Sequence, residues 1–285
     1  MSSSHDFTQK SADREAAENW WATDIIDMQP GVIRYRGYPI QDLISGGVGL
    51  PQMIWLMTRG ELPTAAQARL LDAVLMSAVD HGPQAPSIAI ARMAATCGVG
   101  LNNAMASAVN VLGDVHGGAG EQAVGLYRDA AARIDAGATE TEAVEAALDA
   151  CIAEHGKFIP GFGHRFHPVD PRTAPLLALV DEAAARGEVS GRFATIGRAV
   201  EDAIARRKGG RRIPMNIDGA TAVVYAELDF PAELARGLFC LSRSVGILAH
   251  AWEQTQQGGR NKGPLPRSNI PAYTGHPPRE VPAQT

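Results

Sequence analysis

The chain of 285 residues has few cysteines, few aromatic residues and little excess charge of either sign. Its three cysteines lie in Ala-, Leu- and Val-rich surroundings, and three are too few and too odd in number for a disulfide framework. We therefore expect reduced core cysteines. Lys and Arg number 26 against 31 Asp and Glu, a net charge of −5, which argues against nucleic acid as a partner.

Long uninterrupted hydrophobic runs are also missing. The longest apolar stretch, Pro231 to Trp252, contains Glu233, Arg236, Arg243 and His250, so it does not read as a membrane span. The first residues show neither the basic nor the apolar region of a secretion signal. These features predict a cytoplasmic protein without a membrane partner.

Several catalytic motifs are absent. The sequence has no Gly-x-Ser-x-Gly elbow, so it does not indicate a serine hydrolase. It also has no Walker A sequence, so it does not indicate a P-loop ATPase. His164 and His167 are three residues apart, but no cluster of Cys, Asp or Glu completes a tetrahedral set near them. We therefore expect no metal site.

What the chain does have is helical periodicity along most of its length. Two capping boxes, at Thr64 to Gln67 and Thr139 to Glu142, open amphipathic runs to about Val79 and His155. Strand signals are confined to Val32 to Tyr35 and Ile213 to Ile217. The pattern predicts a nearly all-α fold. Further helices are expected over Gln52 to Thr58, Pro86 to Leu112, Gly120 to Ala136, Pro175 to Arg186, Phe193 to Arg206, Ala220 to Leu228 and Pro231 to Trp252.

Two histidines stand in glycine-rich turns between these helices. His116 lies in the sequence Val-His-Gly-Gly-Ala-Gly-Glu and His164 in Pro-Gly-Phe-Gly-His-Arg, while Asp218 ends the sequence Met-Asn-Ile-Asp. Glycine lets the backbone approach a ligand closely, so histidines in such turns are candidates for a site. Two neutral imidazoles and a carboxylate can together remove a proton from carbon and stabilise the resulting enolate oxygen.

Three arginines and a third histidine accompany them. Arg172 follows Asp170-Pro171, Arg243 lies within the apolar stretch, Arg267 follows Pro266, and His81 stands at a helix end. The guanidinium fork matches a carboxylate bidentately, so these residues suit a small substrate with several carboxylates.

Each of these residues also has a purely structural interpretation. Asp218 taken alone could be the N-cap of the following helix, and Arg172 a solvated charge at a helix start. Arg236, Arg243 and His250 are spaced by seven residues and share one helix face. On that face we interpret Arg236 as an ion-pair partner and His250 as the partner of a buried hydrogen bond, and neither is placed in the site.

The order of the motifs resembles that of the citrate synthase superfamily. The resemblance rests on His116 to Ala119, on Pro160 to Arg165 with Asp170 to Arg172, on Asn216 to Asp218, and on Ser242 to Gly246. Tyr35 to Ile40 and Tyr273 to Gly275 are similar to the flanking motifs of that family. One such motif is weak evidence, whereas five in the family's order are not expected by chance.

The resemblance implies roles for individual residues. His116 would stabilise the thioester enolate, His164 would exchange a proton with the oxaloacetate carbonyl or the tertiary alcohol, and Asp218 would exchange the methyl proton. Carboxylate ligands would be His81, Arg172, Arg243 and Arg267, the last from the second subunit of a homodimer or higher oligomer. The turn formed by Ile159, Pro160, Gly161, Phe162 and Gly163 would contact coenzyme A. Coenzyme A thioesters would be substrates, and no tightly bound cofactor is implied.

Two departures from full-length citrate synthases favour a particular member of the superfamily. The chain is short, resembling stand-alone citryl-CoA lyases and the lyase module of ATP-citrate lyase, and Gly219 follows Asp218 where synthases often carry a bulkier residue. We therefore expect cleavage of citryl-CoA to acetyl-CoA and oxaloacetate. A citrate or 2-methylcitrate synthase and a non-catalytic CoA-binding partner subunit are the alternatives.

The resemblance also implies a two-domain architecture with the active site in the cleft. The large helical domain would comprise residues 1–117 and 220–285, and the smaller, mobile CoA-binding domain residues 118–219.

Overall fold

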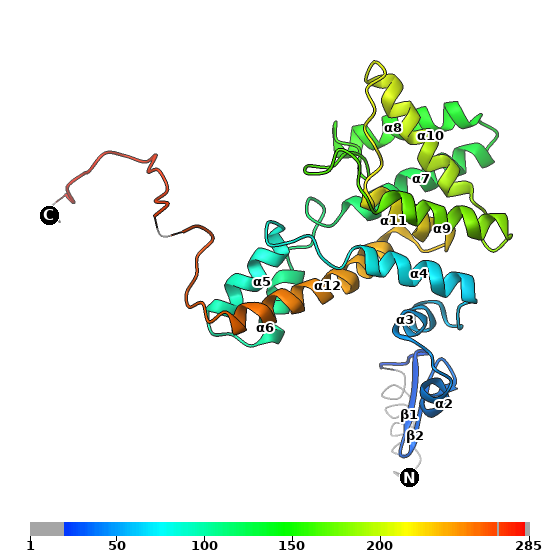
Figure 1. The fold of residues 1–285 in the computed structure, drawn as a ribbon, viewed down its shortest axis with the longest axis horizontal. Coiled ribbons are helices and arrows are strands. Elements are labelled where there is room, and N and C mark those ends of the chain that lie inside the picture. Colours follow the sequence, from blue (N-terminus) through cyan, green and yellow to red (C-terminus); the bar gives the residue numbers. More distant parts are fainter. Residues whose placement is uncertain (1–19, 267, 283–285) are drawn as a thin grey trace, which may run out of the picture.

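The computed structural model describes residues 20–266 and 268–282, and within them helices predominate as expected (Figure 1). A small antiparallel sheet of β1 (Ile26–Gln29), β2 (Val32–Tyr35) and β3 (Tyr38–Pro39) precedes the helices. Arg36 and Gly37 both have positive φ, as a two-residue hairpin turn between β2 and β3 requires. The expected strand at Val32 to Tyr35 is thus confirmed, as part of a hairpin near the N-terminus.

The helices that follow are mostly those expected from the periodicity. Both capping boxes are confirmed, because the Thr64 and Thr139 hydroxyls accept from the amides of Gln67 and Glu142. The helices are α2 (Ile40–Ser45), α3 (Leu50–Arg59), α4 (Ala65–Ser77), α5 (Pro86–Thr96), α6 (Leu101–Val109), α7 (Ala119–Asp135), α8 (Glu140–His155), α9 (Thr173–Ala185), α10 (Arg192–Arg207), α11 (Ile217–Glu227) and α12 (Ala232–Gln256).

Two of the expected elements are wrong. The single helix over Pro86 to Leu112 is two helices, because the chain turns between α5 and α6 at Gly98, whose φ is +84°. The expected strand at Ile213 to Ile217 is an irregular segment with one isolated bridge, between Met215 and Phe162. Ile217, which begins α11, is buried and Ile213 is half-buried, and both pack against the larger hydrophobic core without strand pairing.

Helix α12 is the longest of the described helices, and it connects the α5–α6 pair with the larger group of helices (Figure 1). Its N-terminal half packs with α4 and α7, whereas its C-terminal half packs with α5 and α6. Two clusters of buried residues result. The larger lies among α7, α8, α9, α10 and α11 with parts of α3, α4 and α12, and the smaller lies between α5, α6 and α12.

Helix α11 is surrounded on all sides. Residues 219–226 are buried, and the helix contacts α4, α7, α9, α10 and α12. Its first turn carries Asp218, so the position of that carboxylate is fixed by the largest core of the molecule. The division into domains 1–117 with 220–285 and 118–219 stays a prediction.

Among the residues that the structure describes, no helix is long and apolar enough to cross a membrane.

A glycine on α12 allows this helix to touch the turn that follows α4. The amide of Gly246 lies 3.1 Å from the carbonyl oxygen of Val79, and a Cβ at position 246 would collide with that oxygen. In contrast, a Cβ at Gly237 on the same helix would meet nothing nearer than a Leu234 methyl group at 3.9 Å.

We therefore predict opposite effects of alanine at these two positions. Gly246→Ala should lower the free energy of unfolding by roughly 1–3 kcal/mol, because backbone must move to admit the methyl group. Gly237→Ala should raise it by about 0.5–1 kcal/mol through helix propensity alone. Urea unfolding followed by circular dichroism measures both. Equal effects of the two substitutions would contradict the close approach of α12 to Val79.

Candidate active site

The site residues expected from the sequence come from separate elements around the middle of α12. Arg243 lies on α12 itself, His81 in the turn after α4, and His116 in the loop before α7. His164 and Arg172 lie in the segment between α8 and α9, and Asp218 in the first turn of α11. Arg267 lies outside the described residues.

Arg243 is the most deeply buried of these charged residues, with 6% of its surface exposed. Its Nε donates to the carbonyl oxygen of Ala78 at 3.2 Å, and its guanidinium carbon lies 4.9 Å from the ring centroid of Phe239. The interactions leave the two terminal amino groups available to a ligand. A buried cation of this kind is suited to hold a carboxylate.

His81 and His164 face each other across the site. Their ring centroids are 5.4 Å apart and their planes are at 80°. The Nδ1 atom of His164 lies 3.0 Å from the amides of both Phe166 and His167. Because amides only donate, Nδ1 accepts, and the neutral ring carries its proton on Nε2.

Asp170 connects Arg172 to the helix that carries Asp218. Its fully buried carboxylate accepts from Nε and Nη2 of Arg172, both at 2.9 Å, and from the amide of Ile217 at 3.1 Å. One carboxylate therefore orients a substrate-binding candidate and fixes the start of α11. The terminal Nη1 of Arg172 lies 3.4 Å from the carbonyl of Ser77, next to α12.

The turn expected to contact coenzyme A is attached to the same helix start. Asn216 donates from its backbone amide to the carbonyl of Gly161 at 2.9 Å and from its side chain to that of Gly163 at 2.6 Å. Gly161 has φ of +85°, and a Cβ there would lie 2.8 Å from the Cα of Gly219. The turn and the first residues of α11 thus form one unit.

Asn216, not Asp218, caps α11. The side-chain oxygen of Asn216 accepts from the amides of Asp218 and Gly219 at 2.9 and 3.2 Å. The interpretation of Asp218 as an N-cap is therefore wrong, and its carboxylate is not used in capping α11. Burial raises the pKa of Asp218, whereas the charges of Arg172 and Arg243 act in the opposite direction.

His116 is held by the first turn of α5. Its Nε2 accepts from the amide of Ser87 at 3.2 Å and lies 3.0 Å from the Ser87 hydroxyl. With Nε2 as acceptor, the neutral ring carries its proton on Nδ1, which is then a donor. Burial, and then the charge of Arg243, lower the pKa of His116.

The charges of Arg172 and Arg243 influence the pKa values of the three histidines, Arg172 at His81 and His164 and Arg243 at His81 and His116. Burial lowers the pKa of His81, and Arg172, Arg243 and His164 lower it further. Burial also lowers the pKa of His164, although Asp170 opposes this. Lowered pKa values keep the imidazoles neutral at pH 7, so each has one donor and one acceptor nitrogen. Arg172 and Arg243 both act on the pKa of Asp218 as well, so these two charges connect the candidate residues.

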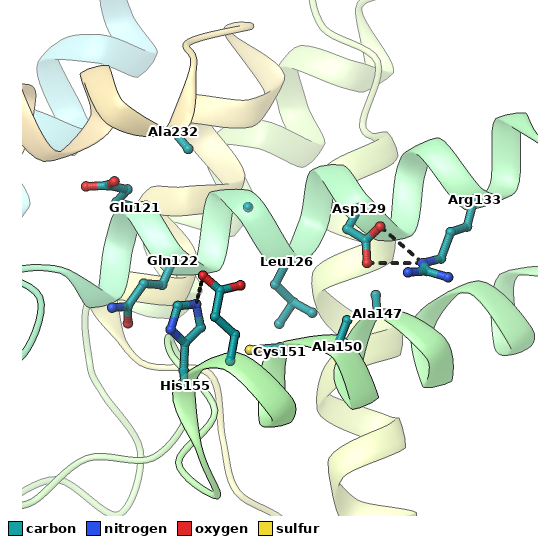
Figure 2. Close-up of a pocket in the computed structure, with 12 residues that line it drawn as sticks. Glu121, Gln122, Leu126, Asp129, Arg133, Ala147, Ala150, Cys151, His155 and Ala232 are labelled. Carbon is teal, nitrogen blue, oxygen red and sulfur yellow. Dashed lines mark hydrogen bonds and ion pairs between the residues drawn. The ribbon is translucent and has the colours of Figure 1, made fainter.

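One groove among the described residues lies elsewhere. It has a volume of about 450 Å³ and lies between α7 and α8, where Leu126, Cys151 and His155 line it together with the Asp129–Arg133 ion pair (Figure 2). None of the candidate catalytic residues lines this groove.

Three positioning residues were not expected from the sequence. Asp170 was noted only as part of a motif, although the sequence Asp-Pro-Arg places a carboxylate two residues before a candidate ligand. Asn216 was noted in the same way, and an Asn two residues before Asp is a recognisable capping signal. Ser87 gave no signal, because its contact with His116 joins residues 29 positions apart.

The interpretation of Arg236 as an ion-pair partner is confirmed, whereas the hydrogen bonds of His250 are partly buried or exposed and not buried as expected. Arg236 forms ion pairs with Asp114 and Glu121. His250 is hydrogen-bonded to Asp80 and Arg92. The sequence alternative for Arg172, a solvated charge, is wrong, because 24% of its side chain is exposed and Asp170 holds it.

Comparison with known proteins defines the family. Residues 64–267 match the model of the citrate synthase C-terminal domain. The chain belongs to the citrate synthase family. It is 31% identical over 222 residues to citrate synthase of Haloferax volcanii, covering 77% of this chain and 53% of that protein. The chain spans about half the length of the first curated relatives that it matches.

Solved structures give a match over nearly the whole chain. Citryl-CoA lyase from Hydrogenobacter thermophilus is 33% identical, with a TM-score of 0.79, and the match covers 92% of this chain and 97% of that one. ATP citrate lyase from Methanothrix soehngenii, solved with citrate and coenzyme A, has a TM-score of 0.74 at 22% identity, covering 93% of this chain and 44% of that one. The latter likeness supports the fold alone.

The central position of Asp170 gives a pH-dependent prediction. Burial raises its pKa, but the hydrogen bonds from Arg172 and Ile217 outweigh this and hold the pKa below its ordinary value. A carboxylate with a lowered pKa in the folded state stabilises the fold above its unfolded pKa, and the effect is lost as the pH falls through the folded value. Asp170→Asn should therefore cost about 1–3 kcal/mol of unfolding free energy at pH 7.

The difference between the two proteins should begin to shrink as the pH falls below about 4, where Asp170 of the unfolded chain takes up a proton, and it should vanish only below the lower pKa that this carboxyl has in the fold. Urea unfolding at pH 7, 5 and 3.5 measures it. Asp181→Asn, in an exposed ion pair with Arg198, is the matched control and should change stability little at any pH. A loss that does not depend on pH would contradict the ionic role of Asp170.

Proposed function

We propose that this protein is a citryl-CoA lyase, which cleaves citryl-CoA to acetyl-CoA and oxaloacetate. The observation that carries the proposal is the match to the citryl-CoA lyase of Hydrogenobacter thermophilus, at 33% identity over 97% of that chain, whereas the match to citrate synthase of Haloferax volcanii covers 53% of that protein. The Asp218-Gly219 sequence is in keeping with this choice.

The chemistry assigns one step to each catalytic residue. His164 takes the proton of the tertiary hydroxyl as the carbon–carbon bond breaks and oxaloacetate forms. The bonding electrons move into the acetyl part, whose thioester oxygen receives a hydrogen bond from Nδ1 of His116. Asp218 in its protonated form then gives a proton to the terminal carbon, and the raised pKa of its buried carboxyl group favours that form.

The described tautomer of His164 corresponds to one side of this reaction. With Nδ1 accepting from two amides, the proton of the neutral ring sits on Nε2, which can donate a hydrogen bond to the carbonyl oxygen of oxaloacetate. A ring that starts with its proton on Nδ1 and takes the hydroxyl proton at Nε2 becomes an imidazolium, and loss of the Nδ1 proton then restores the described tautomer. To begin cleavage, Nε2 must be free and the proton must sit on Nδ1, so the 166–167 backbone has to move away from the ring.

Substrate binding is assigned to the charged residues around Arg243. His81, Arg172, Arg243 and Arg267 would bind the carboxylates of the oxaloacetate part. The turn of Ile159 to Gly163 would bind the pantetheine chain through its backbone. Cationic side chains at Lys208, Arg211 and Arg212 follow α10 shortly before Pro214, which accepts from the Gly163 amide, so they suit the phosphates of coenzyme A.

All of these steps use side chains and the backbone, with coenzyme A thioesters as substrates. We accordingly propose no tightly bound cofactor.

The second candidate function is condensation of an acyl-CoA with oxaloacetate, as in citrate or 2-methylcitrate synthase. The names of the curated relatives favour it. Lyase and synthase share the carbon–carbon step and differ in whether citryl-CoA is hydrolysed. A non-catalytic CoA-binding subunit is a further alternative, against which the presence of all three proton-transfer residues speaks.

Two coupled assays on the purified protein test the proposal. Oxaloacetate released from citryl-CoA is followed with malate dehydrogenase and NADH, and thiol released from acetyl-CoA plus oxaloacetate is followed with a disulfide reagent. A lyase gives the first signal and little of the second. Rapid thiol release would favour the synthase, and coenzyme A binding without either signal would favour the non-catalytic subunit.

Substitution of the catalytic residues gives a quantitative prediction. His116→Gln and Asp218→Asn should each lower kcat for cleavage about 100- to 1000-fold, because each removes a group placed where charge develops. His155→Gln, at the end of α8 in the groove that contains none of the candidate catalytic residues, is the control and should leave kcat unchanged. Near-normal rates of either catalytic variant would refute the assigned roles.

We further propose that the protein works as a homodimer. A stripe of apolar side chains on α12 is exposed although the opposite face of this helix is buried against α5 and α6. The stripe has helical spacing and consists of Leu241, Val245, Leu248 and Trp252, which are 41–58% exposed. An apolar helix face of this kind is typical of a subunit interface. The family resemblance implies that Arg267 crosses such an interface.

A complementation experiment tests the shared site. Chains carrying Asp218→Asn are co-expressed with chains carrying Arg267→Ala, each with its own tag, and the mixed dimers are purified through both tags. If Arg267 serves the partner's site, one of the two sites in each mixed dimer is intact, so activity should recover to about half of the wild-type value. Activity no higher than that of the parent variants would place Arg267 in the site of its own chain.

A further inference from the structure

The three residues before His81, residues 78–80, each contact α12. Arg243 donates from Nε to the carbonyl of Ala78, the amide of Gly246 contacts the carbonyl of Val79, and His250 contacts the carboxylate of Asp80. The three α12 residues are three and four positions apart, which places them on one face of the helix. Consecutive residues of the turn before His81 therefore contact successive residues on one face of α12.

Asp80 connects His250 to the turn that contains His81. Its Oδ2 lies 3.2 Å from the amide of Gly82, so the carboxylate bridges over His81 and closes the turn. His250 reaches the same carboxylate with Nε2, 3.2 Å from Oδ1. Burial raises the pKa of Asp80, but the hydrogen bonds from His250 and from the amides of Gly82 and His81 outweigh it and hold the pKa below its usual value.

The ring orientation of His250 is set from its other side. Nδ1 of His250 lies 3.1 Å from Nη1 of Arg92 on α5. A guanidinium can only donate, so Nδ1 must accept, and the proton of the neutral ring is on Nε2, where it points to Asp80. Arg92 is itself fixed by Glu253 at 2.5 Å and Gln257 at 2.7 Å on α12.

From this geometry we propose that His250 is a positioning residue of the active site. Arg92 selects the Nε2–H tautomer of His250, which holds Asp80, and Asp80 in turn fixes the turn that places His81 opposite His164. This inference rests on the proposed function, because it takes His81 as a ligand of the oxaloacetate carboxylates. His250 itself touches no substrate.

Three variants separate a hydrogen-bond role from a packing role. His250→Leu keeps an apolar side chain of comparable size but has no donor, whereas His250→Gln keeps a side-chain N–H that can reach Asp80. His155→Leu, at the end of α8, makes the same replacement at a partly buried histidine away from the site. Circular dichroism and Tm are recorded first, to show that all three variants fold.

Binding is then measured by calorimetry, with oxaloacetate and with coenzyme A as separate probes. His250→Leu should raise the Kd of oxaloacetate about tenfold, as expected for the loss of one hydrogen bond to a charged group, and should leave the Kd of coenzyme A unchanged. His250→Gln should restore most of the oxaloacetate affinity, and His155→Leu should behave as the wild type. A wild-type Kd in His250→Leu, or equal losses in the Leu and Gln variants, would overturn the proposal.

Nitrogen NMR of the histidine-labelled protein tests the tautomer independently of any substrate. The chain has eight histidines, and the signals of His250 are identified by their loss in His250→Gln. We expect the protonated nitrogen at Nε2 in the wild type, with a mixture of tautomers in Arg92→Leu. A protonated Nδ1 in the wild type would overturn the role of Arg92.

Failure of the proposed function can be told from failure of this inference. Wild-type protein that binds no oxaloacetate would refute the assigned substrate, and the positioning role would fall with it. Wild-type protein that binds oxaloacetate while His250→Leu binds equally well would refute the positioning role alone.

Discussion

The guanidinium of Arg243 is the charge on which the arrangement of the site depends. It is almost fully buried on the longest helix, and its electrostatic influence reaches His81, His116, Arg172 and Asp218. A buried cation without a fixed carboxylate partner is costly to the fold. Here the cost is reduced by the Ala78 carbonyl, the Phe239 ring and the charge of the nearby Asp218. A bound carboxylate would compensate the rest of the Arg243 charge.

Much of the site could be predicted from the sequence because its groups stand in short local motifs. The glycine-rich turns around His116 and His164 and the Asp-Pro-Arg motif mark their residues without reference to the rest of the chain. The helix boundaries were predictable where a cap was present, as at Thr64 and Thr139. They failed between α5 and α6, because apolar periodicity continued across glycines that end one helix and begin another.

Contacts between distant residues could not be predicted in the same way. The tautomers of His116 and His164 are set by amides, and which amide lies beside which ring depends on how α5 and the 166–167 backbone pack. Ser87 carries no chemical signal of its own. Asn216 shows the opposite case, since an Asn at this position is a readable capping signal, whereas the capping alternative that the sequence analysis considered was Asp218, two residues later. The chemistry of the residues was thus more predictable than their hydrogen bonding.

The contact between Gly161 and Gly219 has a consequence for how lyases and synthases could diverge. Neither position has room for a side chain while the two backbones touch. A larger residue after Asp218 would push the turn of Ile159 to Gly163 outward. If the turn binds the thioester as we propose, the thioester would shift with it relative to the Asp218 carboxylate. In the proposed mechanism, a side chain at position 219 would therefore change the distance between the methyl group of the thioester and the Asp218 carboxylate. It would also change the space available to a hydrolytic water.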